Sequence, residues 1–253
     1  MEPIKPFFIS IRNSAVAMVL FLGLWTLFSL FSPAYLIPSP AAVLGGTMGY
    51  LKNDFFHHLL LTLMRVLTGF VVAFLLGSTV GIVSAGMKQV QSINTFLVLC
   101  QVIPGTILGI IFLLLLGIGS RVPIAMVIFL VLPIVAINTA NALLKRNPLL
   151  ENYLRSIGAK RAHFLTNIYL PALIPTFQSN LTIGFGLSLK VVILGEFIGS
   201  QDGIGYLLNL SRIYFKMDQV FFWLLVVVLV MGCFQILQNL LFTVFLGKYF
   251  YPE

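Results

Sequence analysis

The sequence contains very little charge. Only 9% of its 253 residues are Asp, Glu, Lys or Arg, whereas 59% are hydrophobic and the mean hydropathy is +1.05. A soluble domain usually carries about 25% charged residues, and a chain of this length cannot hide so much apolar surface from water. The composition therefore excludes a soluble enzyme and predicts an all-α polytopic membrane protein whose solvent is lipid.

The sequence also lacks the groups that most enzyme centres require. The two cysteines lie inside apolar runs, the three histidines form no metal-ligand pattern, and there is no G-x-x-x-x-G-K-[S/T] phosphate loop. Six membrane helices of about 20 residues would occupy roughly half of the chain and leave no room for a separate soluble domain. We therefore expect a single transmembrane domain over residues 1–253, with no catalytic residue, cofactor or metal site of its own.

Six apolar stretches indicate six membrane helices, and we expect them over residues 15–31, 59–85, 93–116, 122–142, 173–198 and 220–246. An even number of spans places both termini on one side of the membrane. That side and its two connections carry nine basic residues: Lys5, Arg12, Lys88, Lys145, Arg146, Arg155, Lys160, Arg161 and Lys248. The other side carries four: Lys52, Arg121, Arg212 and Lys216. The positive-inside rule then predicts cytoplasmic termini, and it explains the +8 net charge without nucleic-acid binding.

Glycine and proline predict where the helices break. Residues 41–51 read as a short helix after a proline-rich stretch, and residues 199–206, with three glycines, read as a tight, turn-rich loop. Pro104-Gly105 and Pro133 lie inside the third and fourth expected helices and predict kinks or breaks.

The connection between the fourth and fifth helices, residues 147–171, is basic and has a helical pattern. Asn147-Pro148 is a typical helix start, and Gly158 would end or bend the helix. One apolar face is expected from Leu150, Tyr153, Leu154 and Ile157. These patterns alone leave two interpretations open, a helix that lies on lipid headgroups and a helix that docks into a groove of a cytoplasmic partner.

The end of this connection resembles a known motif. Gly158 is followed after nine residues by Ile-Tyr-Leu-Pro at 168–171, which resembles the cytoplasmic motif E-A-A, three residues, G, nine residues, I-x-L-P of ABC importer permeases. The E-A-A positions hold Asn152, Tyr153 and Leu154 instead, and Glu151 lies one residue before the position of the motif's Glu.

Three further stretches resemble, in the right order, the nitrate, sulfonate and taurine branch of these permeases. Residues 36–44 are similar to its L-P-S-P-x-x-V start, residues 58–70 to its H-L…R…G-F run, and residues 195–207 to its A-E-x-I-G…G-L-G-Y-L segment. On these four motifs the chain is identified as a member of the binding-protein-dependent, type I ABC importer permeases.

The resemblance implies a function without chemistry in this chain. Such a permease has six spans in a prokaryotic plasma (inner) membrane and pairs with a second permease copy, as a homodimer or a heterodimer. Two ATP-binding cassette subunits bind ATP and Mg²⁺, and an extracytoplasmic binding protein delivers a small polar or anionic solute of the nitrate, sulfonate, taurine or vitamin-precursor class. The resemblance assigns the contact with the ATPase, through a coupling helix between helices 4 and 5, to Leu150, Glu151, Asn152, Tyr153, Leu154, Ile157, Gly158 and Ala159.

Polar residues inside the spans are candidates for a substrate pathway or for structural pairing. Ser179, Thr182, Gly186 and Lys190 fall on one stripe of the fifth helix, and Pro104-Gly105 would break the third. Lys190 would attract an anion, or alternatively pair with a carboxylate or reach the membrane surface. We expect Arg65 to serve a structural role, with Glu196 as its candidate partner.

The alternative function is a stand-alone secondary transporter or channel subunit that works without an ATPase. Such carriers are usually larger and built from repeats, and no internal repeat is visible in this sequence.

Overall fold

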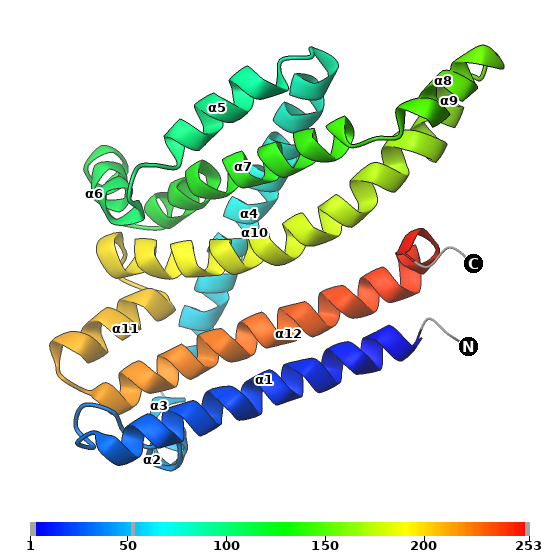
Figure 1. The fold of residues 1–253 in the computed structure, drawn as a ribbon. Helices are drawn as coiled ribbons and strands as arrows, with labels where there is room; N and C mark the ends of the chain where they lie inside the picture. Colours follow the sequence, from blue (N-terminus) through cyan, green and yellow to red (C-terminus); the bar gives the residue numbers. More distant parts are fainter. Residues whose placement is uncertain (1–3, 52–53, 251–253) are drawn as a thin grey trace.

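The computed structural model describes residues 4–51 and 54–250, and within this part every regular element is a helix (Figure 1). The elements are α1 (Ile4–Phe31), α2 (Pro40–Gly45), α3 (Thr47–Tyr50), α4 (Phe55–Gly86), α5 (Val90–Cys100), α6 (Gly105–Leu116), α7 (Arg121–Leu144), α8 (Pro148–Ser156), α9 (Arg161–Phe164), the π-helical turn η1 (Leu165–Tyr169), α10 (Leu170–Gly199), α11 (Ile204–Ile213) and α12 (Met217–Phe250). The expected all-α, multi-pass architecture is confirmed.

Four helical stretches of the described part are long and apolar enough to cross a membrane: α4, α7, Arg161–Gly199 and Met217–Phe242. The pair α5 and α6 counts as a fifth if it is taken as one broken span. The apolar part of α1, Ala15–Phe31, is shorter and coincides with the first expected stretch.

The third expected helix is broken at Pro104, as predicted. The axes of α5 and α6 differ by 80°, and Pro104 precedes α6 in an extended conformation (φ −58°, ψ 134°). Pro133, in contrast, does not break its helix, because α7 continues through it to Leu144. Pro133 is buried, and α7 is held along its length by α4 and α10, which is the setting in which a membrane helix tolerates proline.

Two connections differ from the expectation. Residues 41–51 form two short helices, α2 and α3, which Gly46 separates. The connection after α10 is not only a tight loop, because after a turn ending at Gly203 it continues as α11 over ten residues. Ile204 of α11 is buried in an apolar cluster with Trp25 of α1 and Trp223 of α12. This packing stabilises α11, which was not predicted because the glycine-rich sequence is typical of a loop.

The core lies where α4, α7 and α10 pack together. Val127, Val131 and Val135 of α7 are fully buried there, and glycines of α4 allow the two backbones to approach closely. A Cβ atom at Gly77 would lie 2.7 Å from the Leu132 carbonyl oxygen, and one at Gly81 would lie 2.6 Å from that of Ala136. Glycine at these two positions therefore permits the close packing of α4 on α7.

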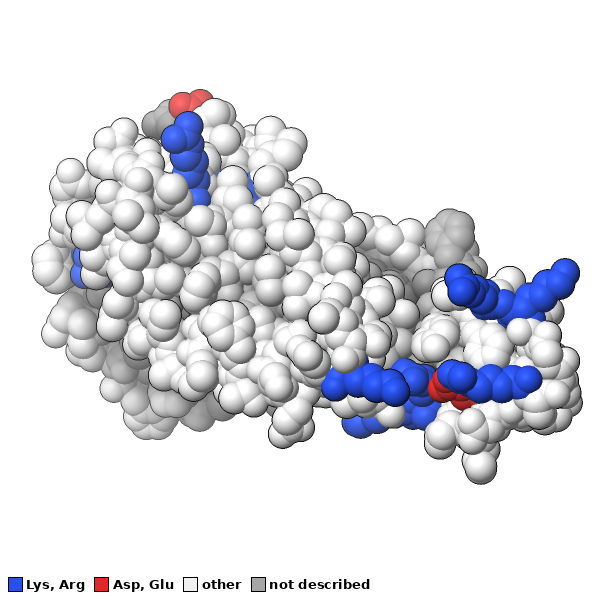
Figure 2. Space-filling view, turned by 90° about the horizontal axis from the view of Figure 1, so that it is seen from above, with Lys and Arg blue, Asp and Glu red and all other residues white. Residues whose placement is uncertain are grey.

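The basic residues lie mainly at one end of the molecule. Both ends of the described chain, the α4–α5 turn and α8 with α9 lie together at the end that we call the α8 end, opposite the α11 end (Figure 1). Figure 2 shows blue Lys and Arg side chains gathered over the α8 end, with fewer at the α11 end. Of the residues in the charge count, Lys52 lies outside the described residues, as do the side chains of Lys5 and Lys248.

The α4–α7 contact can be tested with two matched glycine substitutions. We expect Gly81→Ala to lower stability by about 1–3 kcal/mol, since the added methyl would overlap the α7 backbone. Gly86→Ala, on the same helix but with nothing within 4 Å of the added atom, serves as the control and should not destabilise. Thermal unfolding in detergent measures both, and equal midpoints would contradict the close contact.

Candidate functional site

Helix α8 has well-defined ends that its sequence explains. Asn147 caps it, because its Oδ1 accepts hydrogen bonds from the amides of Leu149 (3.0 Å) and Leu150 (3.4 Å), and Pro148 occupies the first helical position. The start predicted at Asn147-Pro148 is therefore confirmed.

Gly158 ends α8 rather than bending it. Its φ of +67° belongs to the left-handed region, and the amide of Gly158 donates to the Arg155 carbonyl while that of Ala159 donates to the Leu154 carbonyl. These two bonds form a Schellman motif. A Cβ atom at Gly158 would meet nothing within 4 Å, so the backbone conformation requires glycine here and the space around it does not.

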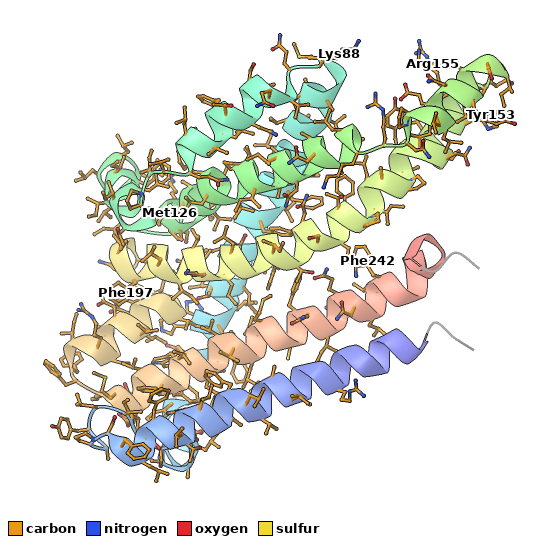
Figure 3. The ribbon with its side chains drawn as sticks, in the orientation of Figure 1. Lys88, Met126, Tyr153, Arg155, Phe197 and Phe242 are labelled. Carbon is orange, nitrogen blue, oxygen red and sulfur yellow. The ribbon has the colours of Figure 1, made fainter. Side chains whose placement is uncertain are left out.

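One part of the apolar face of α8 packs against the rest of the chain, and the other part is exposed. Leu154 is buried against its own chain, whereas Leu150, Tyr153 and Ile157 are exposed. Leu149 is also exposed, at 77%, and adds an apolar side chain that helical spacing alone did not reveal. Asn152 is exposed beside this face, and Tyr153 and Arg155 project from the tip of the molecule in Figure 3.

Glu151 is held within the chain by two arginines. Its Oε2 accepts from Arg146 Nε (2.8 Å) and its Oε1 from Arg155 Nη2 (2.7 Å). Arg146 also donates to the Leu143 carbonyl at the end of α7 and lies over the ring of Tyr169, 5.7 Å from its centroid. We call this set, Arg146, Glu151, Arg155 and Tyr169, the α8 clasp. It ties α8 to the elements on both of its sides, so Glu151 faces the chain and not a partner.

The clasp should depend on pH. The hydrogen bonds from Arg155 and Arg146 lower the pKa of Glu151 below its ordinary value of 4.5. A carboxyl group with a lowered pKa stabilises the fold fully above pH 4.5, and this stabilisation is lost as the pH falls through the lowered pKa. Hydrogen exchange of residues 146–158, corrected for intrinsic rates, should therefore accelerate in that acidic range.

A substitution isolates this effect. We expect Glu151→Gln to accelerate exchange at neutral pH by about five-fold, which corresponds to roughly 1 kcal/mol, and to remove the acidic transition. Asn152→Gln, at the exposed neighbouring position, is the control. An acidic transition that persists in Glu151→Gln would contradict the assignment.

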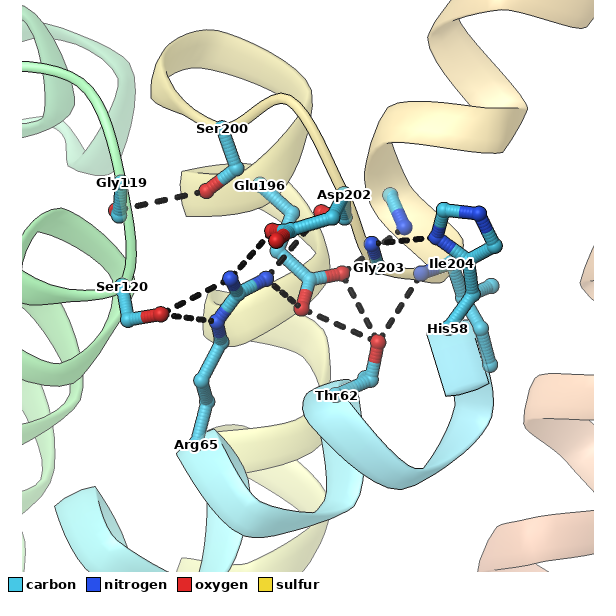
Figure 4. Close-up of polar contacts among 11 residues, drawn as sticks. His58, Thr62, Arg65, Gly119, Ser120, Glu196, Ser200, Asp202, Gly203 and Ile204 are labelled. Carbon is cyan, nitrogen blue, oxygen red and sulfur yellow. Dashed lines mark hydrogen bonds and ion pairs between the residues drawn. The ribbon is translucent and has the colours of Figure 1, made fainter. Parts of the chain in front are cut away.

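A second group of polar side chains is buried at the α11 end (Figure 4). Arg65 of α4 and Glu196 of α10 are 3% and 0% exposed, and their Nη1 and Oε1 atoms are 2.8 Å apart. Arg65 also pairs with Asp202 and donates through Nε and Nη2 to Ser120 Oγ, at 3.0 and 2.8 Å. The structure thus brings together Arg65 and the candidate partner named from the sequence.

The turn before α11 is bonded to this ion pair. Glu196 Oε2 accepts from the amide of Gly205 (2.9 Å), and Thr62 Oγ1 donates to the Glu196 carboxylate (3.0 Å) while accepting from the amide of Ile204 (2.9 Å). The amide of Gly203 donates to His58 Nδ1 at 2.9 Å. These residues form one hydrogen-bonded network with Arg65, Ser120 and Asp202. From the sequence, only its central pair, Arg65 and Glu196, could be proposed.

Two glycines are necessary for this arrangement. A Cβ atom at Gly203 would overlap the Glu196 carboxylate, and one at Gly205 would overlap the Ile193 carbonyl oxygen. Gly203 also has a φ of +97°. The motif over residues 195–207 is thus explained by a backbone turn that closes directly onto a buried carboxylate.

We expect Arg65→Leu to cost about 3–5 kcal/mol, because it leaves the buried Glu196 carboxylate without its counter-ion. The double variant Arg65→Leu with Glu196→Leu should cost less than the sum of the two single variants. Arg121→Leu is the control, since Arg121 is exposed and forms no ion pair with a described residue. A shift of the unfolding midpoint in the double variant that equals the sum of the shifts in the two single variants would contradict the pairing.

The four residues of the expected stripe on α10, Ser179, Thr182, Gly186 and Lys190, do not share one environment. Thr182 Oγ1 accepts from Gln238 Nε2 of α12 at 2.7 Å, and a Cβ atom at Gly186 would lie 3.1 Å from Met231 Cε. These two positions therefore pack against α12. Lys190 is exposed and forms no ion pair within the described residues.

The remaining stripe residue, Ser179, lines an open pocket of about 420 Å³ between α7 and α10. Its other lining residues are Asn138, Asn141, Ala142, Lys145, Pro175, Thr176 and Ile183. The break at Pro104-Gly105 lies elsewhere, because a Cβ atom at Gly105 would face Leu194 and Leu130 at 3.4 and 3.7 Å. The structure thus does not place the pathway candidates in one cavity.

A family model described as "Binding-protein-dependent transport system inner membrane component" matches residues 73–247. Among curated proteins, the formylaminopyrimidine transport permease protein ThiX of Halalkalibacterium halodurans is 27% identical over 173 residues, covering 68% of this chain and 69% of the relative. The taurine transport system permease protein TauC of Escherichia coli is 25% identical over 219 residues, covering 84% and 79%. The riboflavin transport system permease protein RibX of Chloroflexus aurantiacus is 29% identical over 213 residues, covering 83% and 79%.

Solved structures share the fold. A chain of the MetNI methionine ABC transporter in an inward-facing conformation superposes with a TM-score of 0.63 at 19% identity, covering 77% of this chain and 96% of that one. A chain of a bacterial ABC transporter involved in the import of alginate superposes with a TM-score of 0.54 at 18% identity, covering 97% and 96%.

Proposed function

The chain belongs to the family of binding-protein-dependent transport system inner membrane components, and we propose that it forms half of the translocation path of a dimeric, ATP-driven importer. The family consists of transport components and not of enzymes, so this chain is an importer permease subunit. One observation carries the coupling part of the proposal: α8 is a capped helix that presents exposed apolar side chains at the basic end of the molecule.

The proposed permease crosses the membrane six times, through α1, α4, the broken pair α5–α6, α7, α10 and α12. Five of these are long and apolar enough to cross a membrane when α5 and α6 are taken as one span. The sixth, α1, is supported by its 17-residue apolar stretch, Ala15–Phe31, and by its packing along α12. The excess of Lys and Arg at the α8 end supports placing that end, and with it both termini, in the cytoplasm.

In this proposal α8 is the coupling helix, and it docks into a groove on an ATP-binding cassette subunit. Two such subunits bind ATP and Mg²⁺ and hydrolyse the nucleotide. The exposed residues Leu149, Leu150, Tyr153 and Ile157 would contact the ATPase, with Asn152 and Ala159 at the margin. Leu154, Glu151 and Gly158 support the helix from within the chain and are assigned to positioning.

The substrate is a small polar or anionic solute that an extracytoplasmic binding protein delivers to the α11 end. The names of similar proteins support this class, since they specify formylaminopyrimidine, taurine and riboflavin. The second permease subunit is another copy of this chain in the simplest assembly, and a different permease in the heterodimeric one. The path between the subunits would use the exposed face of α10 with Ser179 and Lys190, flanked by Thr182 and Gly186, and the break at Pro104-Gly105.

The coupling proposal can be tested by making one exposed residue of α8 charged. Tyr153→Asp would place an unpaired carboxylate in an apolar groove, so we expect at least a ten-fold loss of the ATPase subunit that copurifies with the permease from cells expressing both. Thr166→Asp, at an exposed position of η1 outside the apolar face, is the control. The proposal would be refuted if Tyr153→Asp copurified as much ATPase subunit as the unaltered chain. It would also be refuted if the unaltered chain copurified no ATPase subunit.

A further inference from the structure

We infer that the pocket between α7 and α10 binds an anionic group, such as a carboxylate, a sulfonate or a phosphate. The inference rests on the proposed function, because it narrows the class of solute that passes along this face. The pocket volume of about 420 Å³ lies within the range that small-molecule sites occupy.

The polar groups of the pocket offer hydrogen-bond donors that the chain itself leaves unused. Asn94 Nδ2 donates to Asn141 Oδ1 at 3.3 Å, which leaves Asn141 Nδ2 without a partner among the described residues. Ser179 Oγ and Lys145 Nζ likewise form no hydrogen bond within the described part of the chain. Asn141 Nδ2, Ser179 Oγ and Lys145 Nζ thus supply the lining of the pocket with donors that suit a group rich in acceptors.

The pocket also contains acceptors, because the hydroxyl oxygens of Ser179 and Thr176 accept hydrogen bonds as well as donate them. Asn138 uses its Nδ2 to donate to Asn180 Oδ1 at 2.8 Å, so its Oδ1 is one remaining acceptor. Thr176 already donates to the Ala172 carbonyl at 3.3 Å. Hydrogen-bond donors and acceptors alone therefore do not select an anion. The preference for an anion comes from Lys145, which is the only ionisable residue among those that line the pocket.

The charge distribution points the same way. The described chain holds five carboxylates, and none of them lines the pocket: Asp54, Asp202 and Asp218 lie at the α11 end, Glu196 pairs with Arg65, and Glu151 pairs with Arg146 and Arg155. Lys145 at the pocket and Lys190 further along the same face of α10 are both free of ion pairs with described residues.

Ser179 and Lys190 are eleven residues apart on α10, or about 16 Å along its axis. An anion that moves along this face would therefore meet a cation at each end and no described carboxylate between them. A cationic solute would be repelled at the same positions.

The anionic group could come from a transported solute or from the phosphate of a lipid headgroup, because the pocket is open and lies towards the α8 end of the spans. The chemistry is the same in both cases, and Lys145 is the residue on which it depends. Lys145→Gln removes the cation from an exposed side chain without internal partners, so the fold should be retained.

The experiment measures binding to the full chain in phosphatidylcholine nanodiscs, with methanesulfonate as the anionic probe and ethylammonium as the cationic one at constant ionic strength. The dissociation constant is obtained from the rise in the unfolding midpoint with probe concentration. We expect methanesulfonate to bind and ethylammonium not to bind. Lys145→Gln should weaken methanesulfonate binding about ten-fold, as is usual for the loss of a charged hydrogen-bond donor.

Two matched variants define the effect. Lys145→Arg keeps the cation and should keep the affinity, while Lys160→Gln removes an exposed cation outside the pocket and should change nothing. In a second arm, the protein is extracted from membranes containing phosphatidylglycerol, and native mass spectrometry counts the retained lipid. Retention that Lys145→Gln abolishes, without methanesulfonate binding, supports the anion site with a headgroup as its occupant.

Equal binding of both probes, or equal methanesulfonate affinity and lipid retention in the unaltered chain and Lys145→Gln, would overturn the inference. The assay contains no ATPase subunit, so its outcome is independent of the copurification test of the proposed function. An importer that couples through α8 but lacks this anion site would pass one test and fail the other.

Discussion

The buried ion pair between Arg65 and Glu196 is the contact on which the α11 half of the molecule depends. Neither charge could remain inside a membrane helix bundle alone, because transferring an unpaired ion from water is far too costly. The two charges are tolerated because four segments converge on them: α4, the residue before α7, the end of α10 and the turn into α11. Glycine at 203 and 205 follows from this requirement, since any side chain there would occupy the space of the carboxylate or of the α10 backbone.

At the α8 end, the requirement is the attachment of α8 to the helices on both sides. In the proposed function α8 transmits motion to the spans, and a helix with that role must be attached to the spans on both sides but need not be buried. The Asn147 cap and the Schellman motif at Gly158 fix the two ends of α8. Arg146 then joins the last turn of α7, Glu151 of α8 and the ring of Tyr169, so a displacement of α8 acts on the ends of both α7 and α10. The apolar side chains that remain exposed are those with no role in this attachment.

The sequence predicts the parts of this structure that depend on local patterns. Long apolar runs give the spans, Asn147-Pro148 gives the start of α8, and the Pro104-Gly105 break appears where a backbone amide is missing. It does not predict α11, because Gly203 and Gly205, which are needed for the close approach to Glu196 and α10, have the same sequence pattern as the glycines of a loop. Helical spacing groups Leu150, Tyr153, Leu154 and Ile157 on one face but does not show which of them points into the chain. Pairing across 131 residues, as between Arg65 and Glu196, could be proposed only because each charge was implausible alone.

The small number of acidic residues connects these features. Four of the five described carboxylates have a partner within the described part of the chain. Glu196 and Asp202 neutralise Arg65, Glu151 neutralises Arg146 and Arg155, and Asp218 accepts a hydrogen bond from Tyr50. The exposed face of α10 therefore keeps its lysine without a counter-charge from the described chain. In the proposed function, a lysine without a described counter-charge on this face favours an anionic solute over a cationic one.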